Sequence, residues 1–228
     1  MRKNILFGAM LSVVMLTACG GQTKQGTSET ATEPTIKSET VHTVTTAEVK
    51  DKTFDELFCS ITENEIPESL FKLIGQDYTV ITSGSATDFN SMTASWGGWG
   101  IMFNKPVTWC MLRANRFTLE KMREQKTYTM CYFDDNFKDQ VMLFGTKSGR
   151  DSDKMKEMTL TPVSTVHGVP AYKEAKLIIE CRLTEVTTVS PDDFEDASSK
   201  QFVVDGYNEA KAYHKLVFGE VTGIWRRR

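Results

Sequence analysis

The chain has 228 residues, 40% of them hydrophobic and 10% aromatic, and its 27 Lys and Arg residues against 30 Asp and Glu residues give a formal net charge of −3. A chain of this size and composition can bury a sizeable core as one domain. The charge balance does not favour a nucleic-acid partner, because the one basic run, residues 226–228, is more typical of a solvated chain end.

The first 18 residues have the pattern of a secretory signal. A basic start at Arg2 and Lys3 precedes an apolar run over residues 5–18 that is too short to span a membrane, and small residues follow it. The sequence "LTAC" resembles the bacterial lipoprotein box, in which the cysteine, here Cys19, becomes the lipid-bearing first residue. We therefore expect removal of residues 1–18 and a lipid-anchored protein of the bacterial cell envelope. The alternative is an ordinary signal peptide with an incidental cysteine.

Residues 19–50 are predicted to be the lipidated cysteine and a flexible tether. The segment 20–50 contains no aromatic residue and is dominated by Thr, Ser, Glu, Lys and Gly. Such a segment cannot bury enough apolar surface to offset the entropy lost on ordering. Residues 51–228 are therefore expected to form the single folded domain.

Most of the domain carries β-strand signals, with runs rich in β-branched and aromatic residues, and its helical segments are short. In the run 175–189, alternation places Glu180 on the solvent face of a half-buried strand. Strands interrupted by short helices predict a mainly β fold, an antiparallel barrel with short helical excursions. The predicted strands cover residues 77–84, 107–113, 127–133, 175–189 and 213–221, and the predicted helices cover 118–125, 137–144 and 151–158.

The cysteines of the domain show neither a CxxC pair nor the spacing of a zinc site, so no metal is predicted. Cys110, Cys131 and Cys181 lie in apolar strand runs, where a free cysteine usually serves as a small hydrophobic residue. Export to an oxidising compartment would permit a disulfide, with Cys59 as a fourth candidate. We favour buried thiols over a bridge.

The stretch "NSMTASWGGWG", residues 90–100, combines hydroxyl side chains with three glycines and two tryptophans. Glycine within a strand often marks a bulge or a close approach of another group to the backbone. One hypothesis is that the strand deforms at the glycines, and that main-chain N–H groups and the preceding hydroxyls donate to a planar heterocycle or an anion. The alternative, which the stretch alone favours, is a bulged barrel strand with both tryptophans in the core.

Two further runs place cationic side chains around helix starts. "RANRFT", residues 113–118, brings two arginines and Thr118 to one predicted helix, and "GTKSGRDSDK", residues 145–154, brings Ser148, Arg150 and Lys154 to the next. Guanidinium groups, hydroxyls and free helix N–H groups suit a phosphate. Each run alone is more often solvated or paired with neighbouring Asp. Together with the glycine-tryptophan stretch, they indicate a phosphorylated heterocycle as ligand.

In this order along the chain, "NSMTASWGG", "RANRFT" and "GTKSGRDSDK" resemble the flavin reductase-like family of FMN-binding split barrels, which includes flavoredoxins. The resemblance covers about residues 65–225, with "YHKLVFGEV" similar to the closing strand of the family. It implies a six-stranded antiparallel split barrel and a homodimer with the flavin close to the subunit interface.

The resemblance also implies noncovalent FMN and assigns its contacts to the three runs. The first run would hold the flavin ring and ribityl chain, the second the ribityl-phosphate, and the third would close the phosphate end. No flavin-transferase signature is present, so covalent attachment is not expected. The implied residues are Asn90, Met92, Thr93, Ala94, Ser95 and Trp96, then Arg113, Arg116, Phe117 and Thr118, then Ser148, Gly149, Arg150 and Lys154.

The function implied is that of a flavin reductase or a flavoredoxin-like electron carrier, in which the flavin supplies the redox chemistry. An exported protein would not meet the cytosolic nicotinamide pool, so the electron donor stays open, as a small molecule or a redox protein. Two alternatives are kept: a lipid-anchored protein that binds flavin or another small ligand without turnover, and a split barrel that has lost its ligand and serves as an interaction module.

Overall fold

The computed structural model describes residues 43–150, 154–207 and 212–228. The predicted signal segment, Cys19 and the tether up to residue 42 lie outside the described residues. Folded structure begins before the expected boundary at residue 51, because helix α1 (Thr46–Val49) buries Val49 in an apolar cluster with Phe54. The last residues of the predicted tether therefore belong to the domain. Within the described ranges, no helix is both long and apolar enough to cross a membrane.

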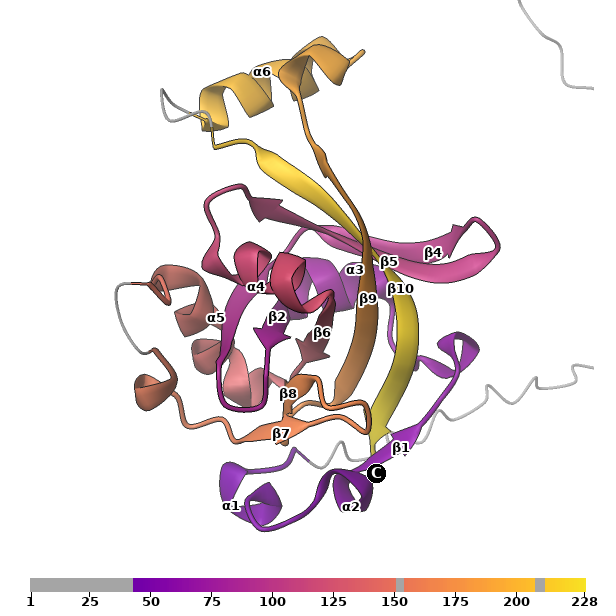
Figure 1. Ribbon diagram of the computed structural model, residues 1–228, viewed down its shortest axis with the longest axis vertical. Helices are drawn as coiled ribbons and strands as arrows, with labels where there is room; N and C mark the ends of the chain where they lie inside the picture. The colour runs from indigo at the N-terminus through magenta and orange to yellow at the C-terminus, as the bar shows by residue number, and fades with distance from the viewer. Residues whose placement is uncertain (1–42, 151–153, 208–211) are drawn as a thin grey trace, which may run out of the picture. The chain divides into compact units, whose positions relative to one another are not determined.

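The described residues of the domain form an antiparallel sheet with helices around it (Figure 1). The strands of this sheet are β1 (Phe58–Ser60), β2 (Thr79–Gly84), β3 (Phe89–Ala94), β4 (Gly97–Met102), β5 (Lys105–Arg113), β6 (Thr127–Tyr132), β9 (Leu177–Thr188) and β10 (His214–Arg227). Their hydrogen-bonded order is β3-β2-β6-β9-β10-β5-β4, and β1 pairs with the end of β10. A separate hairpin joins β7 (Pro162–Ser164) to β8 (Pro170–Tyr172).

The sheet closes through the chain itself. Strands β3 and β4 stand at opposite ends of the hydrogen-bonded order, yet only Ser95 and Trp96 separate them in sequence. β3 pairs with β2 and β4 pairs with β5, so the stretch works as one bent strand shared by both ends of the sheet. Counted in that way, the barrel has six strands, with β1 added at its edge. The predicted antiparallel split barrel with short helical excursions is confirmed.

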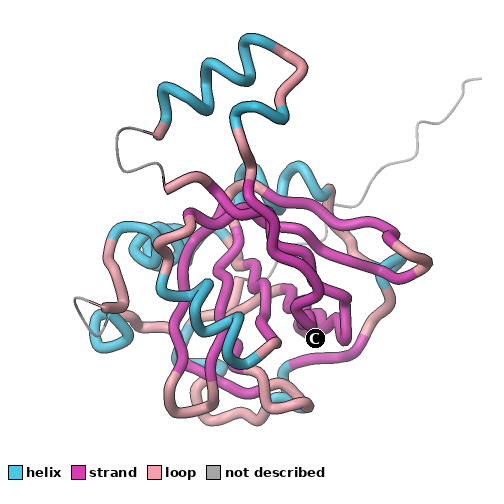
Figure 2. Tube along the Cα trace, turned by 45° about the horizontal axis from the view of Figure 1, so that its top comes forward, coloured by secondary structure: helices cyan, strands magenta, loops and turns pink. Residues whose placement is uncertain are grey.

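Helices lie on the outside of the strands (Figure 2). α4 packs on β2 and β3, and α5 packs on β3. The predicted helices 118–125 and 137–144 are present as α4 and α5, whereas the described part of the predicted helix 151–158 is a single 3-10 turn. The helices are α1, α2 (Phe54–Leu57), α3 (Leu70–Lys72), α4 (Phe117–Gln125), α5 (Lys138–Thr146) and α6 (Ala197–Gly206), with short turns η1 (Glu63–Glu65), η2 (Leu73–Asp77), η3 (Asp135–Phe137), η4 (Lys154–Glu157) and η5 (Pro191–Asp193).

Two apolar clusters form the core, one that joins strand residues to α4 and one that joins strand residues to α1, α2 and α5. The first includes Ile81, Met130 and Ile179, and the second includes Phe144 and Ile178. Cys110, Cys131 and Cys181 are buried free thiols within these clusters, as the sequence predicts. Burial raises the pKa of Cys131 and of Cys181 to about 12, so both stay protonated and unreactive at neutral pH.

Glu180 is a correction to the predicted alternation of β9. Its side chain is not on a solvent face but is 2% exposed. The carboxylate accepts hydrogen bonds from the hydroxyls of Thr165 (2.5 Å) and Thr222 (2.7 Å) and pairs with Nδ1 of His167 (2.7 Å). The β7–β8 hairpin, which carries Thr165 and His167 in its turn, covers this face of β9. A buried carboxylate is tolerated here because its oxygens have hydrogen-bond partners.

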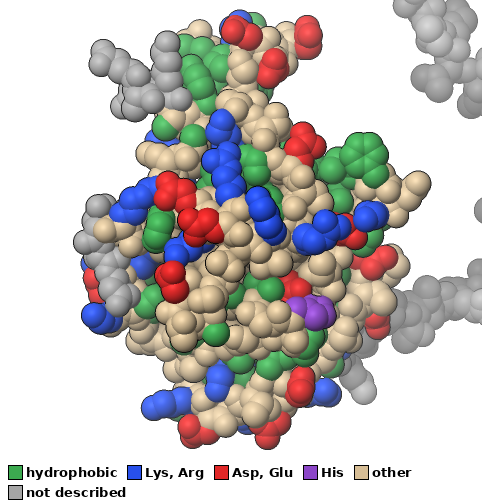
Figure 3. Space-filling model, viewed as in Figure 1, with side chains coloured by type: hydrophobic (Ala, Val, Ile, Leu, Met, Phe, Trp, Pro, Cys, Tyr) green, Lys and Arg blue, Asp and Glu red, His purple; other side chains and the backbone are tan. Residues whose placement is uncertain are grey.

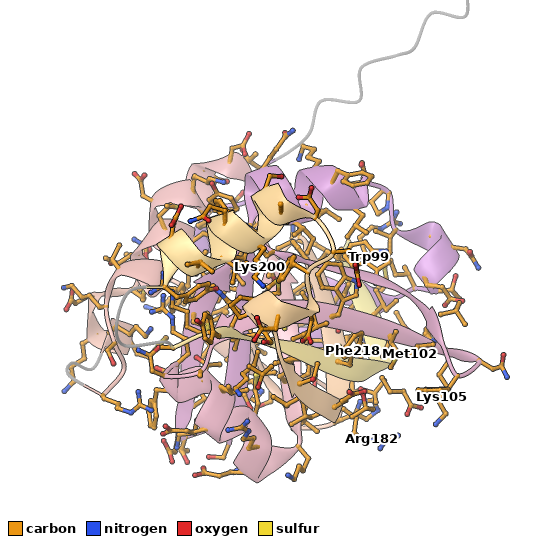
Figure 4. All side chains as sticks on the ribbon, turned by 90° about the horizontal axis from the view of Figure 1, so that it is seen from above. Trp99, Met102, Lys105, Arg182, Lys200 and Phe218 are labelled. Atoms are coloured by element: carbon orange, nitrogen blue, oxygen red, sulfur yellow. The ribbon has the colours of Figure 1, made fainter. Side chains whose placement is uncertain are left out.

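The β4–β5 hairpin extends beyond the barrel. Trp99 lies near its base, edge-on to the ring of Tyr132 at 6.2 Å, whereas Met102 and Lys105 lie at its end (Figure 4). Lys105 pairs with Glu220 of β10 at 3.0 Å, and Arg182 of β9 pairs with the same carboxylate. These ion pairs tie the end of the hairpin to the neighbouring strands.

Candidate functional site

Two of the three glycines in the stretch 90–100, Gly97 and Gly98, make room for Trp109 of the protein itself. A Cβ added at Gly98 would lie 2.7 Å from the ring nitrogen of Trp109, and one added at Gly97 would lie 2.7 Å from its carbonyl oxygen. All three glycines pair with β5. The strand therefore does not deform at the glycines as hypothesised, and the break in the strand falls instead at Ser95 and Trp96.

The hydroxyls of β3 are largely used within the protein. Ser91 hydrogen-bonds to the hydroxyls of Thr82 (2.8 Å) and Tyr172 (2.6 Å), and the Thr93 hydroxyl donates to the carbonyl of Val141 in α5. Thr93 therefore anchors α5. The alternate residues of the strand, Asn90 and Met92, face a cavity beside the start of α4.

This cavity, of about 340 Å³, lies between β3, the start of α4 and the loop that follows α5. It is of the size that small-molecule sites have. Its lining draws on all three sequence runs, and an adjoining cavity of about 620 Å³ shares five of its residues, Asn90, Phe117, Gly149, Arg150 and Lys154. The full lining of the smaller cavity is Asn90, Met92, Asn115, Arg116, Phe117, Thr118, Lys147, Ser148, Gly149, Arg150 and Lys154.

The start of α4 provides helix N–H groups to the cavity. Arg116 is the N-cap residue, with an extended backbone, and its side chain makes no capping hydrogen bond. The first N–H groups of a helix have no partner within the helix, and the positive end of the helix dipole favours an anion there. Burial, and then the nearby charge of Arg113, lowers the pKa of Arg116.

Lys154 is a buried lysine at the edge of both cavities, with 3% of its surface exposed. Its Nζ donates to the carbonyl oxygens of Phe144 (3.1 Å) and Lys147 (3.0 Å). Burial lowers its pKa to about 8, and the charge of Arg116 adds to this effect. Among the described residues, no carboxylate forms an ion pair with Lys154 or Arg116, so their charges are available to an anion.

Asn90 and Gly149 bring the loop after α5 close to β3. The Asn90 side chain is 5% exposed and its Nδ2 donates to the Thr118 hydroxyl at 2.7 Å. A Cβ added at Gly149 would lie 2.0 Å from Oδ1 of Asn90, so only glycine allows this approach. A close backbone approach is a common reason for glycine at a site.

Arg150 fastens the same loop to α4. Its guanidinium group lies 5.2 Å from the ring centre of Phe117, donates to the carbonyl of Asn115 at 2.8 Å and pairs with Glu120. Part of its charge is therefore satisfied by the protein. Acidic and basic side chains lie side by side over α4 (Figure 3).

The structure does not bring every predicted residue to the cavity. Arg113 is exposed and lies 5.3 Å from the ring of Tyr207, and Ala94 packs in the barrel core. Trp96, predicted to face the flavin or the core, is 44% exposed and contacts the rings of Phe202 (6.3 Å) and His214 (5.0 Å). Of the predicted site residues, Thr93, Ala94, Ser95, Trp96 and Arg113 are not in the cavity lining.

Two lining residues, Asn115 and Lys147, were not among the predicted contacts. Both lie inside the predicted runs, at 113–118 and 145–154, and their position beside predicted contacts is the signal that would have found them. His214 of β10 lies outside the cavity lining, and its pKa is lowered to about 4 by burial and then by the charges of Arg113 and Arg116. His214 is therefore neutral at physiological pH, and its Nδ1 has no hydrogen-bond partner within the described ranges.

An antiparallel split barrel with a cationic cavity at a helix start defines a class of small-ligand-binding proteins. The chain belongs to the flavin reductase like domain family, whose family model matches residues 71–228. No curated protein matches the chain.

Solved structures share the fold. An FMN-binding protein from Thermus thermophilus, solved with bound 1-cyclohex-2-enone, is 21% identical, with a TM-score of 0.51 over 74% of this chain and 79% of that one. Flavoredoxin of Desulfovibrio vulgaris (Miyazaki F) is 18% identical, with a TM-score of 0.50 over 72% and 75%. An FMN-binding domain of a flavin reductase-like enzyme from Shewanella baltica is 15% identical, with a TM-score of 0.52 over 74% and 76%.

Proposed function

We propose that the protein binds FMN noncovalently and transfers electrons through it, as a flavin reductase or a flavoredoxin-like carrier. The observation that carries the proposal is the cavity at the start of α4, where Arg116, Lys154 and the Thr118 hydroxyl meet. Cations, a hydroxyl and free helix N–H groups together form the donor set that a phosphate monoester requires. Family membership and the FMN-binding relatives support the same ligand.

The residues present fit the phosphate of FMN in their chemistry. In the proposal, Arg116, Thr118, Ser148 and Lys154 hold the phosphate, and the glycine at position 149 lets the loop after α5 close beside it. Met92 supplies an apolar contact toward the ribityl chain and ring. Bound FMN would supply hydride and single-electron chemistry, while the protein sets its orientation and the charge around it.

The proposal extends to the setting of the domain. We propose that a lipid on Cys19 anchors the domain to a membrane of the cell envelope. That location calls for an electron donor other than the cytosolic nicotinamide pool.

The phosphate end is tested by measuring FMN affinity in the domain and two variants by calorimetry. Arg116→Met should weaken FMN binding by about 10- to 100-fold, the range expected for losing a charge-assisted hydrogen bond. Lys200→Met on α6 removes a charge of the same sign far from the cavity residues and should leave the affinity unchanged. Equal effects of the two substitutions, or no FMN binding by the wild type, would contradict the proposal.

We also propose a homodimer, supported by exposed apolar side chains on the β4–β5 hairpin. Ile101 is 69% and Phe103 85% exposed, and hydrophobic side chains gather at the end of this hairpin in Figure 3. Monomeric proteins seldom leave such groups together in solvent. Light scattering should give twice the monomer mass for the wild type and the monomer mass for Phe103→Asp. A monomeric wild type at micromolar concentration would contradict a homodimer.

A further inference from the structure

The contact between Asn90 of β3 and Thr118 of α4 is buried on both sides. Asn90 is 5% exposed and Thr118 is 0% exposed, and Nδ2 of Asn90 lies 2.7 Å from the Thr118 hydroxyl oxygen. Both residues line the cavity at the start of α4. The two side chains come from elements 28 positions apart in sequence, so the contact depends on α4 packing against β3.

The direction of this hydrogen bond determines what the hydroxyl can do. A threonine hydroxyl has one hydrogen to donate and two lone pairs that accept, whereas an amide nitrogen can only donate. Thr118 is therefore the acceptor, and its own hydrogen stays available. Within the described residues, no acceptor takes that hydrogen in a hydrogen bond. A ligand in the cavity that Thr118 lines could therefore accept this hydrogen.

Gly149 lies against the other end of the Asn90 amide. The Oδ1 end lies against Gly149, where an added Cβ would come within 2.0 Å of it. The Nδ2 end lies toward Thr118 and donates to its hydroxyl. An aspartate at position 90 would offer only acceptors, so it would turn the Thr118 hydrogen away from the cavity and bring a negative charge to it.

We infer that Asn90 is a positioning residue for phosphate recognition. It does not bind the phosphate itself, but it orients the Thr118 hydroxyl so that this hydroxyl donates a hydrogen bond to the phosphate. This inference rests on the proposed FMN site and deepens it, because it makes the site selective for phosphorylated over unphosphorylated flavin. Arg116 and Lys154 attract any anion, whereas an oriented hydroxyl adds a hydrogen bond with a defined direction.

The test compares the affinities for FMN and for riboflavin, which lacks the phosphate. Asn90→Leu removes the donor without adding charge and should weaken FMN binding by about 10-fold, the order expected for a hydrogen bond to a charged group. Riboflavin binding should change less than about 3-fold. Thr118→Val should give the same selective loss, and Thr118→Ser, which keeps the hydroxyl, should restore affinity to near that of the wild type.

A double-mutant cycle separates positioning from simple packing. If Asn90 acts through Thr118, Asn90→Leu should add almost nothing in the Thr118→Val background, because the hydroxyl that it orients is gone. Additive losses, or equal losses for FMN and riboflavin, would overturn the inference. A wild type that binds neither flavin would instead contradict the proposed function itself.

A second variant keeps the test open if Asn90→Leu does not fold. Gly149→Ala keeps the Asn90 and Thr118 side chains but puts a methyl group against Oδ1 of Asn90, so the Asn90 amide must shift. It should produce the same loss for FMN and a small change for riboflavin. Unchanged discrimination between the two flavins in this folded variant would also overturn the inference.

Discussion

Lys154 is the residue whose charge depends most directly on its place in the cavity. Burial brings its pKa down to about 8, below the usual value of about 10.4 for lysine. Between these values the unfolded chain binds a proton that the folded protein does not, so the contribution of Lys154 to stability rises with pH over this window. An FMN phosphate, already dianionic above pH 7, favours the protonated lysine. Phosphate binding should therefore raise this pKa.

FMN affinity is accordingly expected to fall about 10-fold between pH 7 and pH 9, since about one lysine in ten stays charged one pH unit above its pKa. Calorimetry at several pH values measures this, and buffers of different ionisation enthalpy report the proton taken up on binding. Lys154→Met should bind more weakly at pH 7 and lose the dependence near pH 8. A wild-type affinity that stays flat from pH 7 to pH 9 would contradict the role of Lys154.

Gly98 is explained by packing and gives a test that is independent of any ligand. An alanine there would meet the Trp109 ring at 2.7 to 2.9 Å, and the ring must move. We expect Gly98→Ala to lower the free energy of unfolding by about 1–3 kcal/mol, the usual cost of overpacking. Gly100→Ala, on the same strand with no atom within 4 Å of the added Cβ, is the matched control and should have little effect. Urea denaturation compares the two; equal stabilities would contradict the account of Gly98.

At the scale of elements, the β7–β8 hairpin depends on Glu180 of β9. Glu180→Leu would leave the hydroxyl of Thr165, which is 5% exposed, without its acceptor. The expected loss of unfolding free energy is about 1–3 kcal/mol, the cost of an unsatisfied buried polar group. Glu185→Leu on the exposed part of the same strand should change stability little. If Glu180→Leu, but not Glu185→Leu, speeds amide hydrogen exchange in residues 162–172, the hairpin has loosened. Equal exchange rates in the two variants would argue against this role of Glu180.

The elements with strong local signals were predicted, and those set by distant contacts were not. β5, β6, β9 and β10 contain dense β-branched and aromatic runs, and each of these strands begins and ends within six residues of the predicted bounds. α6 was missed, although the Asp196 side chain caps it by accepting from the Ser199 amide at 2.7 Å. The burial of Glu180 could not be read from alternation, because the covering hairpin is formed by residues elsewhere in the chain.

The site followed the same pattern. The runs 113–118 and 145–154 carry their own chemistry, so Arg116, Thr118 and Lys154 could be proposed from sequence, and the structure brings them together. The contact between Gly98 and Trp109 could not be predicted from sequence, because Trp109 reaches Gly98 only through the pairing of β4 with β5. Likewise, the hydrogen bond from Asn90 to Thr118 exists only once α4 lies on β3.

At the scale of the whole molecule, the proposed site for a phosphorylated flavin lies between β3, α4 and the loop after α5 of the split barrel. The fold is that of the flavin reductase like domain family, and the cavity supplies the hydrogen-bond donors and cations that a phosphate requires. The charge of the protein is close to balanced, so the local gathering of Arg113, Arg116 and Lys154, rather than the net charge of −3, would attract the phosphate.

The most direct test of a redox flavoprotein is the absorption spectrum of purified residues 43–228 after addition of FMN, removal of free flavin by gel filtration, and reduction with dithionite. The account predicts a flavin spectrum that stays with the protein, bleaches on reduction and returns in air. A protein that emerges colourless after incubation with FMN would contradict it, and retained flavin that cannot be reduced reversibly would leave binding without electron transfer.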